Sequence, residues 1–412
     1  MTGHMIHSSE RADNFNYAIR NVVRPAEALE RKGRRVIYLN IGDPQSFGFR
    51  PPDFVIEAVN RAVSGKFTGY SHSSGLPEAR EAIARYATKL GAPTEVKDVI
   101  VASGASEAAD LTLTALVNPG DEVLLPAPGY PIYPAIVGKL GARLRYYHLQ
   151  PQEGWLPSVD EIRSLINPKT RAIVLINPSN PAGSITPDNV TREILELAAE
   201  RELLVISDEV YRDLCFSNPP TAAAVLAKES GAAVVTLESL SKTHMLSGWR
   251  IGWLRFTHPE KMGGLNDAVV KLAGGRLCSP TPAQYAVAPA LEDSKEYIAH
   301  FIEEIRRRRD LATSRIAAID GLSCVVPQAA FYLMVKTDHL GGRTDEQFAL
   351  DLLEASGVLV VHGSGFGCDP ADGYFRIVYL ADEQTLDAAL DGIEQAMQMK
   401  RAESGIGAVL HV

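Results

Sequence analysis

Short apolar runs alternate with longer amphipathic segments along much of the chain. The runs occupy residues 99–102, 122–125, 172–176, 203–207 and 234–237, and they are rich in Val, Ile and Leu. Such runs are typical of parallel strands that helices cover on both faces. Over residues 77–90, apolar side chains instead recur at the spacing of one helix face, at Ala79, Ile83, Tyr86, Ala87 and Leu90. The alternation predicts an α/β fold with a mostly parallel central sheet covered by helices.

The pattern differs at both ends of the chain. Residues 25–32 form a predicted helix that ends at Gly33, as many helices do. A long helical pattern over 285–319 precedes apolar runs at 330–336, 358–361 and 375–379. We therefore predict an N-terminal arm and helix (1–40), a large domain (41–285) and a small C-terminal α+β domain (286–412). A ligand is expected at the junction of the two domains.

Composition narrows the classes of function. The chain has 412 residues, a formal net charge of -9 and a pI near 5.6, which argues against nucleic-acid binding through a positive surface. No segment has the pattern of a signal peptide or of a membrane span. The cysteines show no metal-binding spacing, so we expect no metal site and a reducing, cytoplasmic location; they are Cys215, Cys278, Cys324 and Cys368.

The segment from Ser239 to Arg250 carries the first candidate chemistry. A lysine amine becomes nucleophilic when it is desolvated or lies beside other positive charge, and it then forms Schiff bases with carbonyls. Lys242 is therefore a candidate covalent anchor for an aldehyde cofactor. Arg250 offers a planar fork of donors that matches phosphate oxygens, and Ser239 and Ser241 add hydroxyl donors. Taken alone, the same residues also fit a solvated surface loop.

Two further segments place polar side chains at the carboxyl ends of predicted strands. The strand that ends at residue 207 leads into Asp208 and Tyr211, and the strand that ends at residue 176 leads into a proline-rich turn with Asn180. Ligands of open α/β sheets bind at that edge. Asp208 also fits a helix N-cap, and the turn around Asn180 also fits a turn without a ligand.

A third turn, Gly104-Ala105-Ser106, joins a predicted strand to a helix. Backbone N–H groups and the helix dipole favour a phosphate at such a position, although glycine-rich turns of this type are also common without one. Tyr130 follows the next strand, where its ring fits either a stack on a flat cofactor or packing in the core.

These segments occur in the order and spacing of a known family. From about residue 17 to about residue 399 the chain resembles the fold-type I, pyridoxal-phosphate-dependent aminotransferases of class I and II. The resemblance implies that Lys242 forms the internal aldimine and that Asp208 pairs with the pyridine nitrogen. Tyr211 and Asn180 would bond the phenolic oxygen of the cofactor, while Tyr130 stacks on its ring. The phosphate would be held by Gly104, Ala105, Ser106, Ser239, Ser241 and Arg250.

Three more positions take roles through this resemblance. Tyr70 matches a tyrosine that reaches the phosphate across a subunit interface, which implies a homodimer. Arg376 matches the arginine that binds the substrate α-carboxylate, and its planar fork suits that group. Gly42 matches a glycine whose backbone closes over the substrate, and Asn180 would contact the substrate as well.

The implied function is transamination. An ionised Asp208 lets the cofactor accept the electrons released when the substrate loses its Cα proton, and Lys242 moves that proton. The amino group of an L-amino acid then passes to a 2-oxo acid by a ping-pong mechanism. Residues 17–20, 39–44 and 276–284 look most like bacterial and archaeal alanine aminotransferases, so alanine with 2-oxoglutarate is the first expectation. Tyr17, Arg20 and His244 are candidates for selecting the amino acid, although Tyr17 and Arg20 equally fit a packing role at the entry to a helix.

Other functions stay open at this point. An aminotransferase for aromatic or branched amino acids, or a C–S β-lyase, would share every cofactor residue. A non-enzymatic regulator would need a DNA-binding module, and the residues ahead of the first motif contain no convincing helix-turn-helix. A nicotinamide-dependent oxidoreductase is suggested by the glycine run 363–367, which lacks the helix and the acidic residue of the dinucleotide fingerprint.

Overall fold

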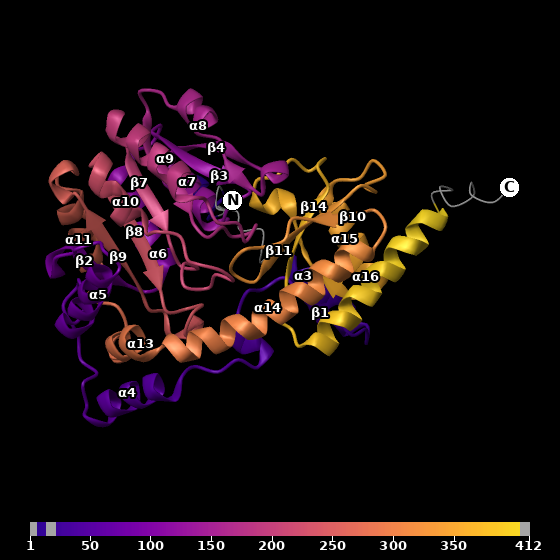
Figure 1. The fold of residues 1–412 in the computed structure, drawn as a ribbon, viewed down its shortest axis with the longest axis horizontal. Coiled ribbons are helices and arrows are strands. Elements are labelled where there is room, and N and C mark those ends of the chain that lie inside the picture. The colour runs from indigo at the N-terminus through magenta and orange to yellow at the C-terminus, as the bar shows by residue number, and fades with distance from the viewer. Residues whose placement is uncertain (1–5, 14–21, 404–412) are drawn as a thin grey trace, which may run out of the picture.

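The computed structural model of the chain describes residues 6–13 and 22–403. Figure 1 shows a large sheet with its helices on one side of the molecule and a smaller sheet with its helices on the other. The long helix α14 (Lys295–Ala318) runs from the first part to the second. Among the described residues, no helix combines the length and the apolar character needed to span a membrane.

The large sheet has eight strands in the order β2-β9-β8-β7-β6-β3-β4-β5. Neighbouring strands from β8 to β4 are parallel, whereas β9 is antiparallel to both of its neighbours and β5 is antiparallel to β4. The mostly parallel sheet that the apolar runs predict is confirmed. The strands are β2 (Val99–Ala102), β3 (Glu122–Ala127), β4 (Arg143–Gln150), β5 (Leu156–Pro157), β6 (Thr170–Ile176), β7 (Leu204–Asp208), β8 (Val234–Ser239) and β9 (Gly252–Thr257).

The first apolar run is paired differently from the prediction. Residues 99–102 form β2 at the edge of the described sheet, next to the antiparallel strand β9 instead of a parallel one. The apolar runs do not reveal β9, because this strand carries the charged residue Arg255. Arg255 is nevertheless buried, since its Nε lies 2.6 Å from Glu238 Oε2 in an ion pair on β8. A buried, ion-paired charge can therefore cause a core strand to be missed when strands are predicted from apolar runs.

Helices cover both faces of the large sheet, because successive side chains of a strand point to opposite faces. Helices α6, α7 and α11 pack on one face with Val123 and Leu125, whereas α8, α9 and α10 pack on the other with Leu124. α5 and α13 cover the β2 end of the sheet. The helices are α5 (Pro77–Lys89), α6 (Ala105–Leu116), α7 (Ile132–Lys139), α8 (Val159–Leu165), α9 (Asp188–Glu200), α10 (Ala223–Ser230), α11 (Leu265–Gly275) and α13 (Val287–Asp293). α5 closely follows the predicted helix 77–90.

The smaller sheet has four antiparallel strands in the order β10-β11-β14-β13. α14, α15 and α16 pack against it around one apolar core. The elements are β10 (Leu322–Cys324), β11 (Tyr332–Thr337), β13 (Val361–His362), β14 (Tyr374–Val378), α15 (Asp345–Ser356) and α16 (Glu383–Glu403). The smaller α+β part is thus present, and the boundaries at residues 40 and 285 stay predictions.

The N-terminal segment joins the smaller part of the molecule. α3 (Val23–Arg31) corresponds to the predicted helix 25–32, and it packs beside α15. β1 (Ile37–Tyr38) then pairs in parallel with β12 (Val358–Leu359). Two short helices complete this end of the chain, α1 (Glu10–Asp13) and α4 (Asp53–Ser64). The segment between β1 and α4 is thereby brought to the space between the two sheets.

Two predicted elements are divided in the structure. The predicted helix 285–319 is wrong as a single element, because α13 and α14 divide this region, and α12 (Thr281–Gln284) ends just before it. Pro289 lies in the first turn of α13, where a missing N–H group costs no hydrogen bond, but it would break a helix that began at residue 285. The run 358–361 is divided between β12 and β13, which pair with β1 and β14 respectively.

Candidate active site

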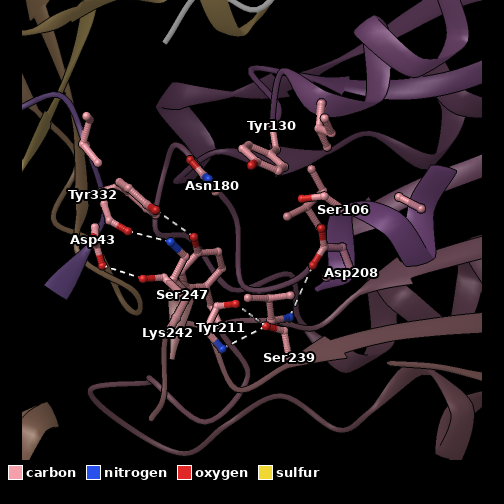
Figure 2. A pocket seen from close by; sticks show the side chains of 18 of the residues that line it. Asp43, Ser106, Tyr130, Asn180, Asp208, Tyr211, Ser239, Lys242, Ser247 and Tyr332 are labelled. Carbon is pink, nitrogen blue, oxygen red and sulfur yellow. Dashed lines mark hydrogen bonds between the residues drawn. The ribbon is translucent and has the colours of Figure 1, made fainter. Parts of the chain in front are cut away.

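The carboxyl ends of the parallel strands and the start of the smaller sheet enclose a cavity of about 720 Å³. Figure 2 shows side chains that converge on it from several elements. β7 ends in Asp208, β8 ends in Ser239, and β14 carries Arg376. The predicted site residues that line the cavity are Gly42, Ala105, Ser106, Tyr130, Asn180, Asp208, Tyr211, Ser239, Ser241, Lys242, Arg250 and Arg376.

One end of the cavity is rich in hydrogen-bond donors. Ser239 Oγ donates to Ser241 Oγ at 2.8 Å and accepts from the Ser241 N–H group at 2.9 Å. Arg250 donates to the carbonyl oxygens of Ser247 and Ser103 at 2.8 and 3.2 Å, which holds its guanidinium beside the start of α6. An anion placed here would meet hydroxyls, a guanidinium and the N–H groups of the first turn of α6.

Gly104 shapes this end of the cavity without lining it. Its φ is +82°, and a Cβ at this position would overlap Arg250 Nη2. Glycine is therefore needed both for the backbone conformation and for the close approach of the arginine. Gly104 thus lets Arg250 pack against the turn, and its place among the cofactor-binding residues stays a prediction.

Lys242 lies in the turn after β8, and its side chain is buried in the cavity. Its Nζ donates to the backbone oxygen of Gly42 at 2.6 Å. Burial lowers the pKa of Lys242 to about 8; Asp43 opposes this change, while Arg376 and Arg250 add to it. At neutral pH the amine therefore has a larger neutral, nucleophilic fraction than an exposed lysine has.

Asp208 is buried at the end of β7. The Tyr133 hydroxyl donates to Asp208 Oδ2 at 2.8 Å, and the Val210 N–H group donates to Oδ1 at 3.3 Å. Burial raises the pKa of Asp208 to about 6, and the two hydrogen bonds limit that rise because they favour the carboxylate. A cationic ring nitrogen in the cavity would favour the carboxylate further.

Arg376 is buried on β14 and held in a fixed plane. Its Nη1 donates to Asn180 Oδ1 at 3.1 Å, and its Nη2 donates to the backbone oxygen of Asn40 at 2.6 Å. The guanidinium carbon lies 4.5 Å from the ring centre of Tyr332 and 4.6 Å from that of Phe366. A guanidinium with a fixed plane is suited to a carboxylate that accepts two parallel hydrogen bonds.

The cavity also contains residues that the sequence analysis does not single out: Asp43, Tyr133, Ser247 and Tyr332. Ser247 Oγ donates to Asp43 Oδ1 at 2.7 Å, which joins the segment after β1 to the turn that follows Lys242 (Figure 2). Tyr332 Oη lies 2.7 Å from Tyr211 Oη.

Sequence signals exist for two of these residues. Asp43 directly follows Gly42, and Tyr133 lies three residues after Tyr130, a spacing that places both on one side of a helix turn. Tyr332 lies in an apolar strand pattern that equally fits core packing, so its place in the cavity depends on the folded structure.

Two other predicted residues, Tyr70 and His244, are not brought into this cavity. Tyr70 is 84% exposed, so a role at the phosphate requires a second copy of the chain. His244 is buried and faces α13: its Nε2 lies 3.0 Å from Ala290 O and 2.7 Å from Ser294 Oγ. It therefore does not contact an amino acid in the cavity, which corrects the expectation from its place beside Lys242. Tyr17 and Arg20 lie outside the described residues.

The residues of the cavity suit pyridoxal 5′-phosphate. The serines and Arg250 offer donors for a phosphate, Asp208 offers an acceptor for a protonated ring nitrogen, and the Lys242 amine can condense with an aldehyde. A buried carboxylate and a buried amine whose pKa values are shifted in opposite directions are typical of a reactive site. Within residues 6–13 and 22–403, no group of His, Cys, Asp and Glu side chains is arranged to bind a metal ion.

Comparison with known proteins gives consistent matches. Residues 34–393 match the family model described as aminotransferase class I and II. The glutamate-pyruvate aminotransferase AlaA of Haemophilus influenzae is 35% identical over 390 residues, which cover 93% of this chain and 96% of the relative. An alanine aminotransferase of Mycobacterium tuberculosis is 34% identical over 392 residues, which cover 93% of this chain and 90% of the relative. The solved structure of an alanine aminotransferase from Pyrococcus furiosus has a TM-score of 0.93 at 39% identity, over 95% of this chain and 100% of that one.

Proposed function

The chain belongs to the class I and II aminotransferases, and we propose that it moves the amino group of L-alanine to 2-oxoglutarate with pyridoxal 5′-phosphate as cofactor. The observation that carries the proposal is the convergence of Lys242, Asp208 and Arg376 on one cavity. Together they offer a reactive amine, an acceptor for a cationic ring nitrogen and a binding group for an α-carboxylate. The relatives at 34–35% identity are named for alanine or for glutamate and pyruvate, which favours these substrates.

Each residue has a distinct part in the proposed reaction. When bound, pyridoxal phosphate supplies an electron sink for the pair of electrons that the Cα proton leaves behind. Arg376 orients the substrate through its α-carboxylate. With the cofactor bound, the free Lys242 amine would take the proton from the substrate Cα and deliver it to the cofactor carbon bonded to the amino nitrogen, a step worth about 10²- to 10⁴-fold in rate. A pKa of about 8 suits both directions of this transfer.

We expect two half-reactions that are separated in time. The amino group stays with the enzyme when the first 2-oxo acid leaves, and the second 2-oxo acid then takes it. All the amino and oxo acids carry a carboxylate next to the reacting carbon, so they use Arg376 in turn. Ping-pong kinetics follow, because the first oxo acid leaves before the second binds and the enzyme keeps the amino group in between.

We propose further that the working unit is a homodimer. The exposed fractions of Tyr70 and Phe67 are 84% and 60%, so both side chains are available for contact with a second copy of the chain. In a dimer the Tyr70 hydroxyl of one copy would reach the phosphate of the other. A mixture of the variants Lys242→Ala and Tyr70→Ala should regain part of the activity, because one site of each mixed dimer carries neither change.

The decisive experiment for the cofactor is reduction of the purified protein with borohydride. A yellow protein whose cofactor becomes fixed to Lys242 supports the proposal, whereas a label on another lysine, or no bound aldehyde, contradicts it. A panel of amino donors with 2-oxoglutarate and pyruvate as acceptors then tests the substrates. Faster turnover of aromatic or branched donors, or cleavage of a C–S bond, would favour the related activities instead.

A further inference from the structure

Tyr332 and Tyr211 form a pair of buried hydroxyls on the wall of the cavity (Figure 2). Tyr332 begins β11 in the smaller sheet, whereas Tyr211 follows β7 in the large sheet. Their hydroxyl oxygens are 2.7 Å apart, and their rings meet edge to face with centres 5.5 Å apart. This hydrogen bond therefore joins the two parts of the molecule inside the cavity.

The ring of Tyr332 is held from several other directions. A Cβ at Gly42 would overlap Tyr332 Oη, so the backbone of that segment lies against the hydroxyl. The Arg376 guanidinium carbon lies 4.5 Å from the Tyr332 ring centre, and the Phe331 ring centre lies 4.8 Å away. Few rotamers fit such surroundings, so the hydroxyl stays beside Tyr211.

The direction of the hydrogen bond follows from what Tyr211 must do. Each phenol has a single proton to donate. When an anionic oxygen lies in the cavity beside Tyr211, Tyr211 donates to that oxygen, and it can then only accept from Tyr332. Burial raises the pKa of Tyr211 well above its ordinary value, and the facing groups Tyr332, Tyr130 and Asp208 act in the same direction. Tyr211 therefore stays a neutral donor.

We propose that Tyr332 is a positioning residue for the transamination: its hydroxyl donates to Tyr211 and thereby directs the Tyr211 proton towards the phenolic oxygen of the cofactor. The inference rests on the proposed function, since that function supplies the phenolic oxygen. Hydrogen bonds in a chain polarise one another, so the bond from Tyr332 also strengthens the one that Tyr211 donates.

The test is Tyr332→Phe, which removes one oxygen and keeps the ring beside Arg376 and Gly42. The cofactor-loaded protein is titrated with acid and base, and the midpoint is read from its visible absorbance. Without the Tyr332 hydroxyl the phenolic oxygen is stabilised less, so the proton affinity of the chromophore should increase by roughly threefold. Tyr211→Phe should act in the same direction and more strongly. The double variant should match Tyr211→Phe alone, because the effect of Tyr332 on the chromophore passes through the Tyr211 hydroxyl.

Tyr379→Phe is the matched control. Tyr379 directly follows β14, which belongs to the same sheet as β11. Its buried hydroxyl donates to Ala330 O at 3.1 Å, and the residue does not line the cavity. Its loss should lower the thermal stability without moving the absorbance midpoint.

A Tyr332→Phe protein that is less stable but keeps the wild-type midpoint would overturn the inference, and so would additive effects of Tyr332→Phe and Tyr211→Phe. Both of these results require a wild-type protein that binds pyridoxal phosphate. A wild-type protein that binds none would instead overturn the proposed function and this inference together.

Discussion

Lys242 and Asp208 lie in the same cavity, and the pKa of each side chain is shifted from its ordinary value. Burial is the largest cause in both cases, and it lowers the pKa of the lysine to about 8 and raises that of the aspartate to about 6. Each change favours the neutral form of the group. The cavity is therefore suited to a ligand that carries both an aldehyde, which can react with the amine, and a positively charged ring nitrogen, which can pair with the carboxylate.

The buried amine should cost the cofactor-free protein stability. Below pH 8 Lys242 is charged both folded and unfolded, and the folded chain carries the burial penalty. As the pH rises from about 8 to 10.5, the unfolded chain binds more protons, so the wild-type protein gains stability. Lys242→Met should therefore raise the free energy of unfolding at pH 7 by up to about 3 kcal/mol, and this advantage should vanish near pH 10.5.

Urea unfolding of the cofactor-free proteins at several pH values measures this difference. Lys89→Met is the control, because Lys89 is an exposed lysine at the end of α5. It should show no such dependence on pH. A Lys242→Met protein that is no more stable than the wild type at pH 7 would contradict the burial argument.

Arg376→Ala should weaken the binding of amino acids and oxo acids alike, because both lose the same charged hydrogen bonds. We expect KM to rise roughly 10- to 100-fold for each. Arg308→Lys is the comparison: Arg308 is buried in the same part of the molecule and donates to Leu380 O, but it does not line the cavity. Steady-state kinetics with both substrates measure these KM values. An unchanged KM for Arg376→Ala would contradict the proposal that Arg376 binds the α-carboxylate.

At the level of elements, the phosphate end of the cavity depends on an antiparallel pair. β2 and β9 place Ala102 opposite Gly252, so the turn after β2 and the residues before β9 meet at one edge of the sheet. Gly104 and Arg250 are therefore neighbours although 146 positions separate them, from 104 to 250. The donors for an anion come together only because β9 enters the sheet in this direction.

Gly104→Ala tests this arrangement. The added Cβ would overlap Arg250 and strain a backbone with φ of +82°, so we expect a cofactor dissociation constant at least ~10-fold higher. Gly120→Ala is the matched control, because Gly120 has φ of +89° but open space at its Cβ. Both variants should lose about 1–2 kcal/mol of stability to the backbone strain. Equal cofactor affinity in the two variants, measured by titration of the cofactor-free proteins, would argue against the Arg250 contact.

In the molecule as a whole, the four residues 40–43 hold the two sheets and the lysine turn together. The backbone of Asn40 accepts from Arg376, that of Gly42 accepts from Lys242, and the Asp43 side chain accepts from Ser247. A second connection runs on the far side of the lysine turn, where His244 contacts Ala290 and Ser294 at the junction of α13 and α14.

His244 should make the whole molecule sensitive to acid. Burial lowers the pKa of His244 from 6.5 to about 4, so its neutral form stabilises the fold fully above pH 6.5 and this contribution is lost as the pH falls towards 4. His244→Gln removes the titration. The difference in free energy of unfolding between wild type and variant should therefore shift by about 3 kcal/mol in favour of the variant between pH 6.5 and 4.

Denaturant unfolding at pH 7, 5.5 and 4.5 would follow this shift, and acid effects common to both proteins cancel in the difference. His300→Gln, on the exposed side of α14, is the control and should follow the wild type. Curves for wild type and His244→Gln that stay parallel over this range would show that the buried imidazole does not control acid stability.

The features that could be predicted from the sequence are those that leave a pattern in a short segment of the chain. Apolar runs revealed β3, β6, β7 and β8, and polar residues at or just after the ends of these strands revealed part of the cavity lining, including Asp208, Ser239 and Lys242. The pattern missed β9 because its charge is neutralised by a partner on another strand. It also joined α13 and α14 into one predicted helix, 285–319, since periodicity alone does not register the break at Ser294 between them.

Local sequence sufficed to name Lys242, Asp208 and Arg250 as candidates, because strand ends and turns are short-range features. Arg376 lies inside a strand pattern, and it was named through the family resemblance. The order of the strands, the approach of Tyr332 to Tyr211 and the bond from Tyr133 to Asp208 required the fold, since they join residues far apart in the chain. The shifted pKa values of Lys242, Asp208 and His244 also required the fold, because burial depends on all the residues packed around a group. The sequence thus determined which candidate residues the site contains, whereas the tertiary packing determined their contacts and their pKa values.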